Sequence, residues 1–297
     1  MPRYNGPVID THHHLWRADN GFITAPVGAR MYAEDAAPIR RPYPVEELIE
    51  DFGDHNVVKS VHVQTNGYAD PMDEPRWLQQ TADRAGYPHA IVAYADMTDP
   101  NLGRHLDALA KLTNMRGVRH QLCWDVKVKN RYVDRPDLCW TPEFRRGVAM
   151  LKDYDFSFDL QGFPLQFSGF ADLIRANPKT KFALIHAGHI EDTSAEGIAY
   201  WRDGLRWLVD LPNLHVKCSG LNMFARNLDP NRINIALATV IAMFGLDRCF
   251  YGSNFPMEKI WVTYDAYISA YKDTLAHMSA ADQRTFFHDN GAKFYRI

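Results

Sequence analysis

The sequence lacks the features that mark several large classes of protein. No stretch approaches the ~20 consecutive apolar residues that a membrane-spanning helix needs. Positive charge is not in excess, because 33 Lys and Arg stand against 36 Asp and Glu for a net charge of -3, whereas nucleic-acid binding needs a clustered basic surface. The 18 Gly and 17 Pro are too few and too scattered for a disordered or collagen-like chain. These absences predict a globular protein whose partner is a small molecule, with no membrane or nucleic acid.

Cysteine is also scarce, at 4 residues, and no two of them form a C-x-x-C pair. A chain of 297 residues buries enough core to need no disulfide bonds. We therefore expect reduced, buried thiols rather than nucleophiles at Cys123, Cys139, Cys218 and Cys249. Residues 1–6 contain no apolar segment of the signal-peptide kind, so a cytoplasmic location is expected.

Eight short apolar or mixed runs recur along the chain, as expected of strands that are covered on both faces. They lie at 8–10, 57–64, 90–96, 117–121, 156–161, 182–186, 214–219 and 249–253. Helical patterns separate them, and no linker rich in Pro, Gly or Ser divides the chain. Eight alternating units close into a single α/β domain over residues 1–297, a (β/α)8 TIM barrel. A doubly wound open sheet is the alternative, disfavoured because no Gly-rich phosphate loop follows the first run.

Helices are expected where apolar residues recur at helical spacing, within 102–112, 201–208 and 264–275. Helix starts are predicted from capping side chains, three of them before a proline, at Asp99, Thr141, Asp229 and Ser279. The longest segments between strands, 15–56 and 122–155, both follow the carboxyl end of a strand. In a barrel these are the loops that carry the active site.

Polar side chains collect at the carboxyl ends of the eight runs. The first run leads into Asp-Thr-His-His-His. Because strand side chains alternate, His12 and His14 should both point into the barrel mouth, whereas His13 points into the helical layer. Two imidazoles on one side can ligate a metal ion or hold a carbonyl oxygen. With His186 at the end of the sixth run, we favour a reaction site over a chance cluster of histidines.

Four further residues are candidates for substrate binding. Arg119 ends the fourth run and offers a fork of donors to a carboxylate or carbonyl oxygen, although a salt bridge to a loop acid is an equally open alternative. Gln64 and Gln161 also end runs and can hydrogen-bond an oxygen-rich ligand, but singly each is more typical of a structural role. Trp16 is a candidate pocket wall, against the commoner packing role of an aromatic ring.

Together these motifs resemble the amidohydrolase superfamily. They are V-I-D-x-H-x-H-x-W near the start, then G-V-R-H, L-I-H-A-G-H and Y-G-S-N-F-P. The likeness covers nearly the whole chain and is strongest to the amidohydrolase 2 branch, which includes 2-pyrone-4,6-dicarboxylate lactonase and sugar-lactone hydrolases. It implies that His12, His14 and His186 surround the scissile carbonyl and that Arg119 holds the substrate. It also implies that some relatives bind zinc or a similar ion, whereas some lactonases of the branch work without metal.

The sequence departs from this family pattern at two strand ends. Asn254 stands where the lactonases have an aspartate that activates water, and an amide cannot act as a general base. Gln161 stands where metal-binding relatives have a histidine or lysine, which excludes the usual binuclear centre. We therefore expect Asn254 to orient the water or the ring oxygen, with either His186 or Glu258 as the base.

A metal ion stays an open question at this stage. His12, His14 and His186 with one water would suffice for a catalytic zinc, although three histidines without a carboxylate make a poor closed site. We therefore expect either no cofactor or one divalent metal, with zinc favoured.

The leading hypothesis is hydrolysis of a small lactone or related cyclic ester, carboxylated substrates included. His12, His14 and Arg119 would polarise its carbonyl group. One alternative is a mononuclear metal-dependent C–N hydrolase or non-oxidative decarboxylase. Another is a barrel that binds a small acid without turning it over. The identity of the substrate and the oligomeric state, a homo-oligomer included, stay open.

Overall fold

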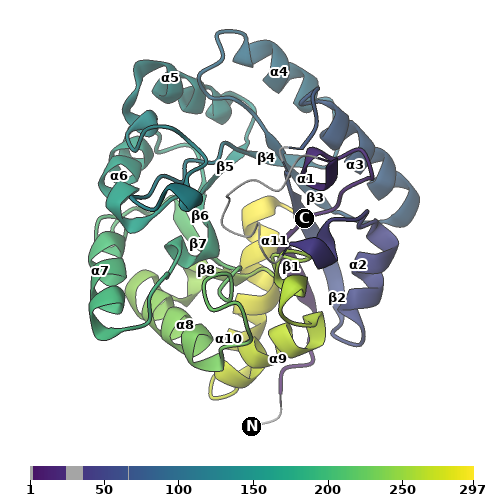
Figure 1. The fold of residues 1–297 in the computed structure, drawn as a ribbon, viewed down its shortest axis with the longest axis vertical. Coiled ribbons are helices and arrows are strands. Elements are labelled where there is room, and N and C mark those ends of the chain that lie inside the picture. Colours follow the sequence, from purple (N-terminus) through teal and green to yellow (C-terminus); the bar gives the residue numbers. More distant parts are fainter. Residues whose placement is uncertain (1–2, 25–35, 66) are drawn as a thin grey trace.

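The computed structural model describes residues 3–24, 36–65 and 67–297. Eight parallel strands form one sheet in chain order (Figure 1). They are β1 (Val8–His13), β2 (Val57–Val63), β3 (Ala90–Tyr94), β4 (Met115–Arg119), β5 (Ser157–Leu160), β6 (Phe182–Leu184), β7 (Leu214–Cys218) and β8 (Cys249–Tyr251). A parallel bridge between His13 and Phe255 brings the end of β8 back to β1. The predicted (β/α)8 barrel is confirmed, and the open doubly wound sheet is wrong.

All eight predicted strands are present, with ends that differ by at most three residues. The largest difference is in β1, which runs to His13 rather than stopping at Asp10. Its last residues are held on both sides, because His13 pairs with His62 of β2 and the backbone N–H of Asn254 donates to the His12 carbonyl over 2.6 Å. His12 and His13 are therefore part of the strand itself and His14 follows it directly, which fixes the direction of these side chains.

Helices separate the strands and cover the outside of the sheet (Figure 1). They are α1 (Gly21–Thr24), α2 (Val45–Phe52), α3 (Asp73–Ala85), α4 (Leu102–Leu109), α5 (Pro142–Met150), α6 (Phe167–Ala176), α7 (Ala195–Leu205), α8 (Pro230–Phe244), α9 (Tyr264–Thr274), α10 (Ala280–Arg284) and α11 (Asn290–Tyr295). Among residues 3–24, 36–65 and 67–297, no helix is long and apolar enough to cross a membrane.

Three of the four predicted helix caps are confirmed. The side chains of Thr141, Asp229 and Ser279 each accept a hydrogen bond from a backbone N–H three residues on. The prediction at Asp99 is wrong: α4 begins at Leu102, because the Asp99 carboxylate instead accepts from the Asn101 N–H over 2.7 Å in the preceding turn.

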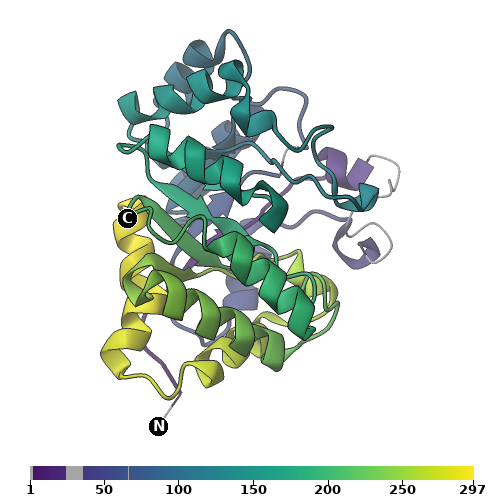
Figure 2. The ribbon, with the colours of Figure 1, turned by 90° about the vertical axis from the view of Figure 1, so that its left-hand side faces the viewer.

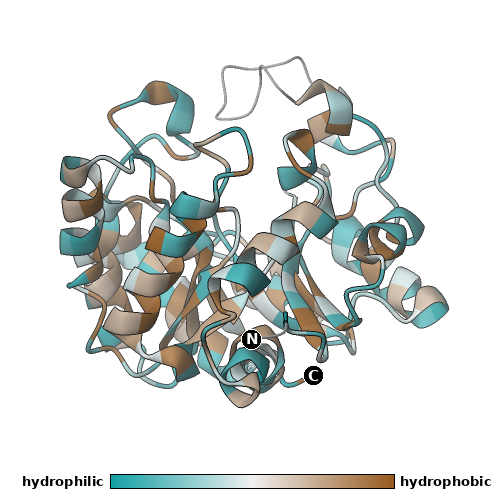
Figure 3. Cartoon of the chain, turned by 90° about the horizontal axis from the view of Figure 1, so that it is seen from below, coloured by the Kyte–Doolittle hydropathy of each residue, from teal (hydrophilic) through white to brown (hydrophobic). Residues whose placement is uncertain are grey.

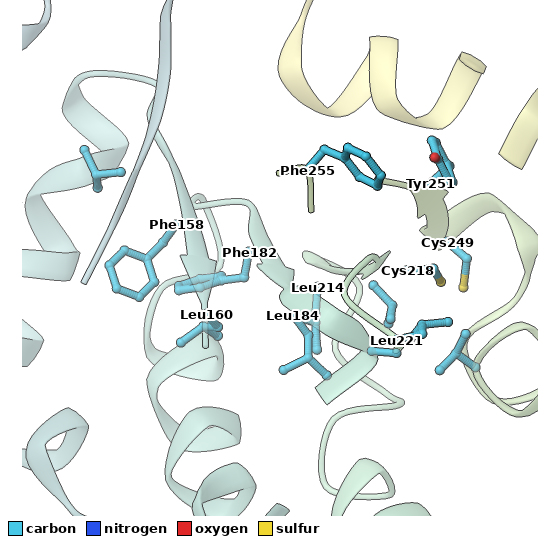
Figure 4. Close-up of a cluster of buried hydrophobic side chains, with 14 of the residues drawn as sticks. Phe158, Leu160, Phe182, Leu184, Leu214, Cys218, Leu221, Cys249, Tyr251 and Phe255 are labelled. Atoms are coloured by element: carbon cyan, nitrogen blue, oxygen red, sulfur yellow. The ribbon is translucent and has the colours of Figure 1, made fainter. Parts of the chain in front are cut away.

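The outward faces of the strands carry the main hydrophobic layer, between the barrel and its helices. Figure 4 shows part of it, with Phe158 and Leu160 of β5 beside Phe182 and Leu184 of β6, followed by β7 and β8 side chains. Figure 3 shows the same division, with brown apolar residues concentrated on the strands and teal polar residues common on the outer helices. Burial of this layer holds the helices in place around the sheet.

The four cysteines lie in buried positions and form no disulfide. Burial raises the pKa of the Cys139 thiol to about 12, and burial also raises the pKa of the Cys123 thiol. Both of these thiols therefore stay protonated at neutral pH and are not nucleophiles.

The C-terminal segment closes the barrel at the amino ends of the strands. Phe294 and Tyr295 of α11 pack among six side chains that point into the barrel, namely Val61, Val63, Ala90, Val92, Ala183 and Phe250. In Figure 2 this yellow segment lies on the left, whereas the loops after β1, β2 and β4 project to the right. One end of the barrel is thus plugged by apolar residues, and the loops gather at the other.

A buried ion pair spans the barrel interior between the plug and the loops. Lys217 Nζ of β7 lies 2.7 Å from Asp159 Oδ2 of β5, and neither side chain is exposed. The Tyr295 hydroxyl donates to Asp159 Oδ1 over 3.1 Å. Lys217 thereby places a positive charge beneath the carboxyl ends of the strands.

Candidate active site

The carboxyl end of β1 brings His12 and His14 into the same pocket. Their ring centroids lie 5.1 Å apart and both rings are buried. His13 points the other way, with its Nε2 2.9 Å from Ser60 Oγ. Asp10 holds this strand end against β8, since its Oδ1 accepts from the backbone N–H groups of His12 and Ser253. This arrangement matches the alternation expected from the sequence.

His14 has a defined tautomer. Its Nδ1 lies 2.6 Å from the Val63 carbonyl, which can only accept, so Nδ1 carries the proton. Burial lowers the pKa of His14 well below its ordinary value, so the ring is neutral and Nε2 is an acceptor. Asn254 Oδ1 faces this Nε2 at 3.3 Å. Two acceptors cannot bond, so the contact requires the Asn254 amide to be turned end for end, with its NH2 toward His14.

His186 reaches the pocket through an unusual backbone. Residues His186, Ala187, Gly188 and His189 all have positive φ angles, from 49° to 72°, a conformation that L-residues adopt rarely and at a cost. The turn places the His186 ring 4.7 Å from that of His12, with its Nδ1 2.9 Å from Ser219 Oγ.

Gly220 makes room for this ring. A Cβ at Gly220 would lie 2.5 Å from His186 Nδ1, and the φ angle of +61° also favours glycine. The strained turn and the glycine together fix one imidazole next to His12. Strain held at a site by its surroundings is typical of functional positions.

Arg119 extends from the end of β4 and is buried. Its Nη2 donates to the Gln64 carbonyl over 2.5 Å and its Nη1 to Gln161 Oε1 over 3.4 Å. These partners are a backbone carbonyl and an amide, neither of which neutralises the guanidinium. The structure thus provides a fixed positive charge at the strand ends, with Gln161 positioning it.

Several buried polar atoms near these residues have no hydrogen-bond partner among the residues that the structure describes. They are both ring nitrogens of His12, both amide atoms of Gln64, and Nε of Arg119. A buried donor or acceptor without a partner costs about 1–3 kcal/mol. Their concentration at the strand ends indicates a place where an oxygen-rich ligand completes the hydrogen bonds.

The electrostatics of this site favour neutral imidazoles in a positive field. Burial, reinforced by neighbouring positive groups such as Lys217 and Arg119, lowers the pKa of His12 and His186 well below the ordinary value. Each neutral ring then has one donor and one acceptor nitrogen. A developing negative charge on a substrate oxygen would be stabilised here.

The donor set does not fit a metal ion. Within the described residues, no group of three or more His, Cys, Asp or Glu side chains could hold one. The chemistry agrees, because the Asn254 amide replaces a charged ligand, while Arg119 and Lys217 add positive charge nearby. The positive charge of a divalent cation among these groups would be poorly compensated.

Trp16 is placed differently from a pocket wall. It is only 2% exposed, its Nε1 donates to the Arg41 carbonyl over 2.6 Å, and its ring stacks 6.5 Å behind that of His14. This packing supports His14 from the rear and indicates a positioning role.

The sequence did not single out one feature of this region, and it indicated a second one only as a candidate base. His189 carries an unpartnered Nε2 and lines a cavity of about 490 Å³ beside the barrel mouth, together with Met223 and Phe224. Met223 also touches the Asn254 amide at 3.3 Å, which links the cavity to the site. The second feature is Glu258, which was considered only as a base and lies fully buried next to Asn254.

Comparison with known proteins places this geometry in a family. A profile of the amidohydrolase family matches residues 9–297. The chain is 34% identical over 297 residues to the protein y4mH of Sinorhizobium fredii, which covers 98% of each chain. It is 28% identical over 305 residues to the L-fucono-1,5-lactonase of Burkholderia multivorans, which covers 97% of this chain and 96% of the lactonase.

Solved structures agree with the sequence comparison. An amidohydrolase from Burkholderia multivorans, solved with bound HEPES and in another crystal form with zinc, superposes with a TM-score of 0.83 at 26% identity. The match covers 98% of this chain and 100% of that one. The chain therefore belongs to the amidohydrolase family and is an enzyme of the amidohydrolase superfamily.

Proposed function

We propose that this enzyme hydrolyses a small lactone or a related cyclic ester, with a carboxylate or hydroxyl groups beside the scissile bond. The observation that carries the proposal is the buried Arg119 guanidinium, which forms no salt bridge with any acid in the described part of the chain. It lies beside ring nitrogens of His12 and a side-chain amide of Gln64 that have no partner there either. These groups offer donors to a carbonyl oxygen and to a second oxygen-bearing substituent. The likeness to an L-fucono-1,5-lactonase supports the same substrate class.

In the proposed reaction, His12 and Arg119 donate to the carbonyl oxygen, and a water molecule attacks the carbonyl carbon. His14 was expected to polarise the carbonyl as well, but it has no N–H to give to the substrate. Its Nδ1–H is already bonded to the Val63 carbonyl, and its Nε2 is an acceptor. Each preorganised donor to such an oxyanion is worth about 3–4 kcal/mol in well-studied enzymes.

The proton of the attacking water has to be carried to the leaving oxygen. His186 is the proposed carrier: with Nδ1 donating to Ser219 Oγ, its Nε2 accepts the proton as the carbon–oxygen bond to water forms. When the ring carbon–oxygen bond breaks, His186 returns the proton to the departing alkoxide. The product is an open-chain hydroxy acid, and the enzyme regains its starting state.

The test is proton release by the purified protein, measured by pH-stat against a panel of sugar lactones and carboxylated lactones. We expect turnover without added metal. Arg119→Met should lower kcat/KM by ~100-fold or more, because it removes the fixed charge and its donors. Arg119→Lys keeps the charge without the planar fork, so it should retain intermediate activity on a carboxylated lactone. Absence of turnover with every lactone, with and without zinc, would refute the proposal.

A second candidate is a mononuclear metal enzyme acting on a C–N bond or removing a carboxyl group. The observation in its favour is that the Burkholderia multivorans amidohydrolase was solved with bound zinc. Elemental analysis separates the two candidates. Near-stoichiometric zinc or manganese, with activity lost on chelation and restored by metal, would support the second and contradict the metal-free mechanism.

The remaining alternative is a barrel that binds a small acid without turning it over. It predicts that a lactone or carboxylic acid raises the unfolding temperature by mass action while no proton is released. The same panel therefore distinguishes binding from catalysis.

A further inference from the structure

Glu258 is a buried acid that forms no salt bridge with any residue in 3–24, 36–65 or 67–297. It begins the short 3-10 helix Glu258–Ile260 after β8, and its backbone N–H lies 3.3 Å from the Asn254 carbonyl. Its side chain is 0% exposed, and neither carboxyl oxygen has a hydrogen bond of good geometry. A carboxylate anion in such a place is costly, whereas a neutral carboxylic acid is tolerated.

Among the described residues, no cation is found next to Glu258 that would hold its carboxylate ionised. The groups that face it are the Asn254 side chain, the Asn222 backbone, and the phenols of Tyr251 and Tyr267. Burial raises the pKa of both tyrosines well above 10, so both are neutral.

The adjacent lysine does not serve Glu258 either. Lys259 Nζ lies 2.7 Å from Glu47 Oε1 and 2.7 Å from Asp51 Oδ2. Burial raises the pKa of Glu258 to about 8, while the approach of Asn254 and Asn222 offsets only part of that effect. At neutral pH the acid is therefore mostly protonated.

His14 constrains the Asn254 amide independently of Glu258. Its tautomer requires the NH2 of Asn254 to face Nε2, which turns the amide oxygen toward the opposite side, where Met223 and Glu258 lie. An amide oxygen there needs a donor, and a protonated carboxylic acid supplies one. The burial of Glu258 and the tautomer of His14 thus lead independently to the same proton arrangement.

We propose that Glu258, as a neutral carboxylic acid, donates a hydrogen bond to the Asn254 amide oxygen and so fixes the amide NH2 toward His14. Glu258 is then a positioning residue. It acts through Asn254, which presents a second N–H to the barrel mouth as a donor. Protonated Glu258 and Asn254 are thus two neutral groups in the place where related lactonases have a charged aspartate. The effects on kcat expected below rest on the proposed hydrolysis.

The kinetic test compares Glu258→Gln with Glu258→Met. The glutamine side chain is permanently neutral and can still donate to Asn254, so kcat should stay within about threefold at pH 7. The methionine variant has similar volume but no donor, so kcat should fall by ~10-fold or more with little change in KM. In the unmodified enzyme, kcat should decline as pH rises through about 8, and the glutamine variant should lack that decline.

Two outcomes would overturn the proposal. If Glu258→Gln is as inactive as Glu258→Met, Glu258 is not a positioning donor but a group that must ionise. An increase of kcat as the pH rises through 8 in the unmodified enzyme would also show that Glu258 acts as an ionised group.

A readout that needs no turnover separates this proposal from the proposed function. Infrared difference spectroscopy should show the carbonyl band of a protonated carboxylic acid at pH 7 that disappears in Glu258→Gln. Because the folded protein holds this proton up to about pH 8 but the unfolded chain only to about 4.5, the unfolding free energy should fall between those values. Glu258→Gln should lack this part of the fall. If neither signature is present, Glu258 is ionised and the proposal is wrong, whether or not any lactone is hydrolysed.

Discussion

Asn254 occupies a backbone position that limits which residues can stand there. Its φ angle is +62°, a left-handed conformation that asparagine and aspartate tolerate better than other residues with a Cβ. Its N–H also completes the contact between β8 and β1. Asparagine here supplies an amide donor that an aspartate cannot, at no additional backbone cost.

The substitution Asn254→Asp tests this role directly. Aspartate suits the same backbone, but it replaces the NH2 donor with a carboxylate beside the acceptor nitrogen of His14. We expect kcat for a hydrolysed lactone to fall by ~10- to 100-fold. Circular dichroism and the unfolding midpoint, as the control, should stay close to those of the unmodified enzyme. A large gain in lactonase activity would instead show that the native protein has left that chemistry.

The candidate site residues at strand ends could be predicted from the sequence, because side chains along a strand alternate between its two faces. His12, His14 and Arg119 could be placed because the end of a strand determines where its side chains point. The proposed role of Glu258 and the tautomer of His14 could not be predicted in this way. Both depend on which atoms lie across the barrel, such as the Val63 carbonyl, and no spacing along the chain encodes that contact.

At the scale of the elements, the barrel interior contains a charged crosslink where most barrels have apolar layers. Lys217 of β7 and Asp159 of β5 face each other under the site, and Tyr295 of α11 bonds the same carboxylate. The crosslink connects two strands to the plug. Burial lowers the pKa of Lys217, and Asp159 opposes that shift.

A double-mutant cycle measures this crosslink. Lys217→Met or Asp159→Asn alone leaves one buried partner uncompensated, so each should lower the free energy of unfolding by about 3–5 kcal/mol. The double variant should lose much less than the sum, because neither charge is left unpaired. Denaturant unfolding checks this. Asp203→Ala, which breaks an exposed pair with Arg206, is the control and should cost under ~1 kcal/mol. Additive single effects would mean that the two charges do not interact.

For the whole molecule, the order of eight apolar runs was enough to predict the barrel. Short runs separated by helical stripes leave few other topologies. The C-terminal plug was not predicted, although the chain ends in an aromatic-rich segment. Its partners are Val and Ala side chains of β2, β3 and β6 together with Phe250 of β8, and their inward direction follows only from the closed barrel. The wrong prediction of a helix cap at Asp99 has a local cause. An aspartate side chain can accept a hydrogen bond from the backbone N–H two residues on, here that of Asn101, and so stabilise a turn as well as begin a helix.

The plug should stabilise the molecule without taking part in its chemistry. Phe294 is 1% exposed and its ring packs 5.0 Å from His215 and 5.3 Å from Phe250. Phe294→Ala should therefore lower the free energy of unfolding by about 3–5 kcal/mol, through lost burial and a cavity at the amino end of the barrel. Lys293→Ala, an exposed position on the same helix, should change it by less than ~0.5 kcal/mol.

Activity measurements on the same two variants complete this prediction. At a temperature where Phe294→Ala is still folded, its kcat/KM should equal that of the native enzyme, because the plug and the catalytic loops lie at opposite ends of the barrel (Figure 2). A loss of kcat/KM without unfolding would show that the Lys217–Asp159 ion pair transmits the structural change from the plug to the candidate active site. Tyr295, which contacts both Phe294 and Asp159, is the residue through which it would pass.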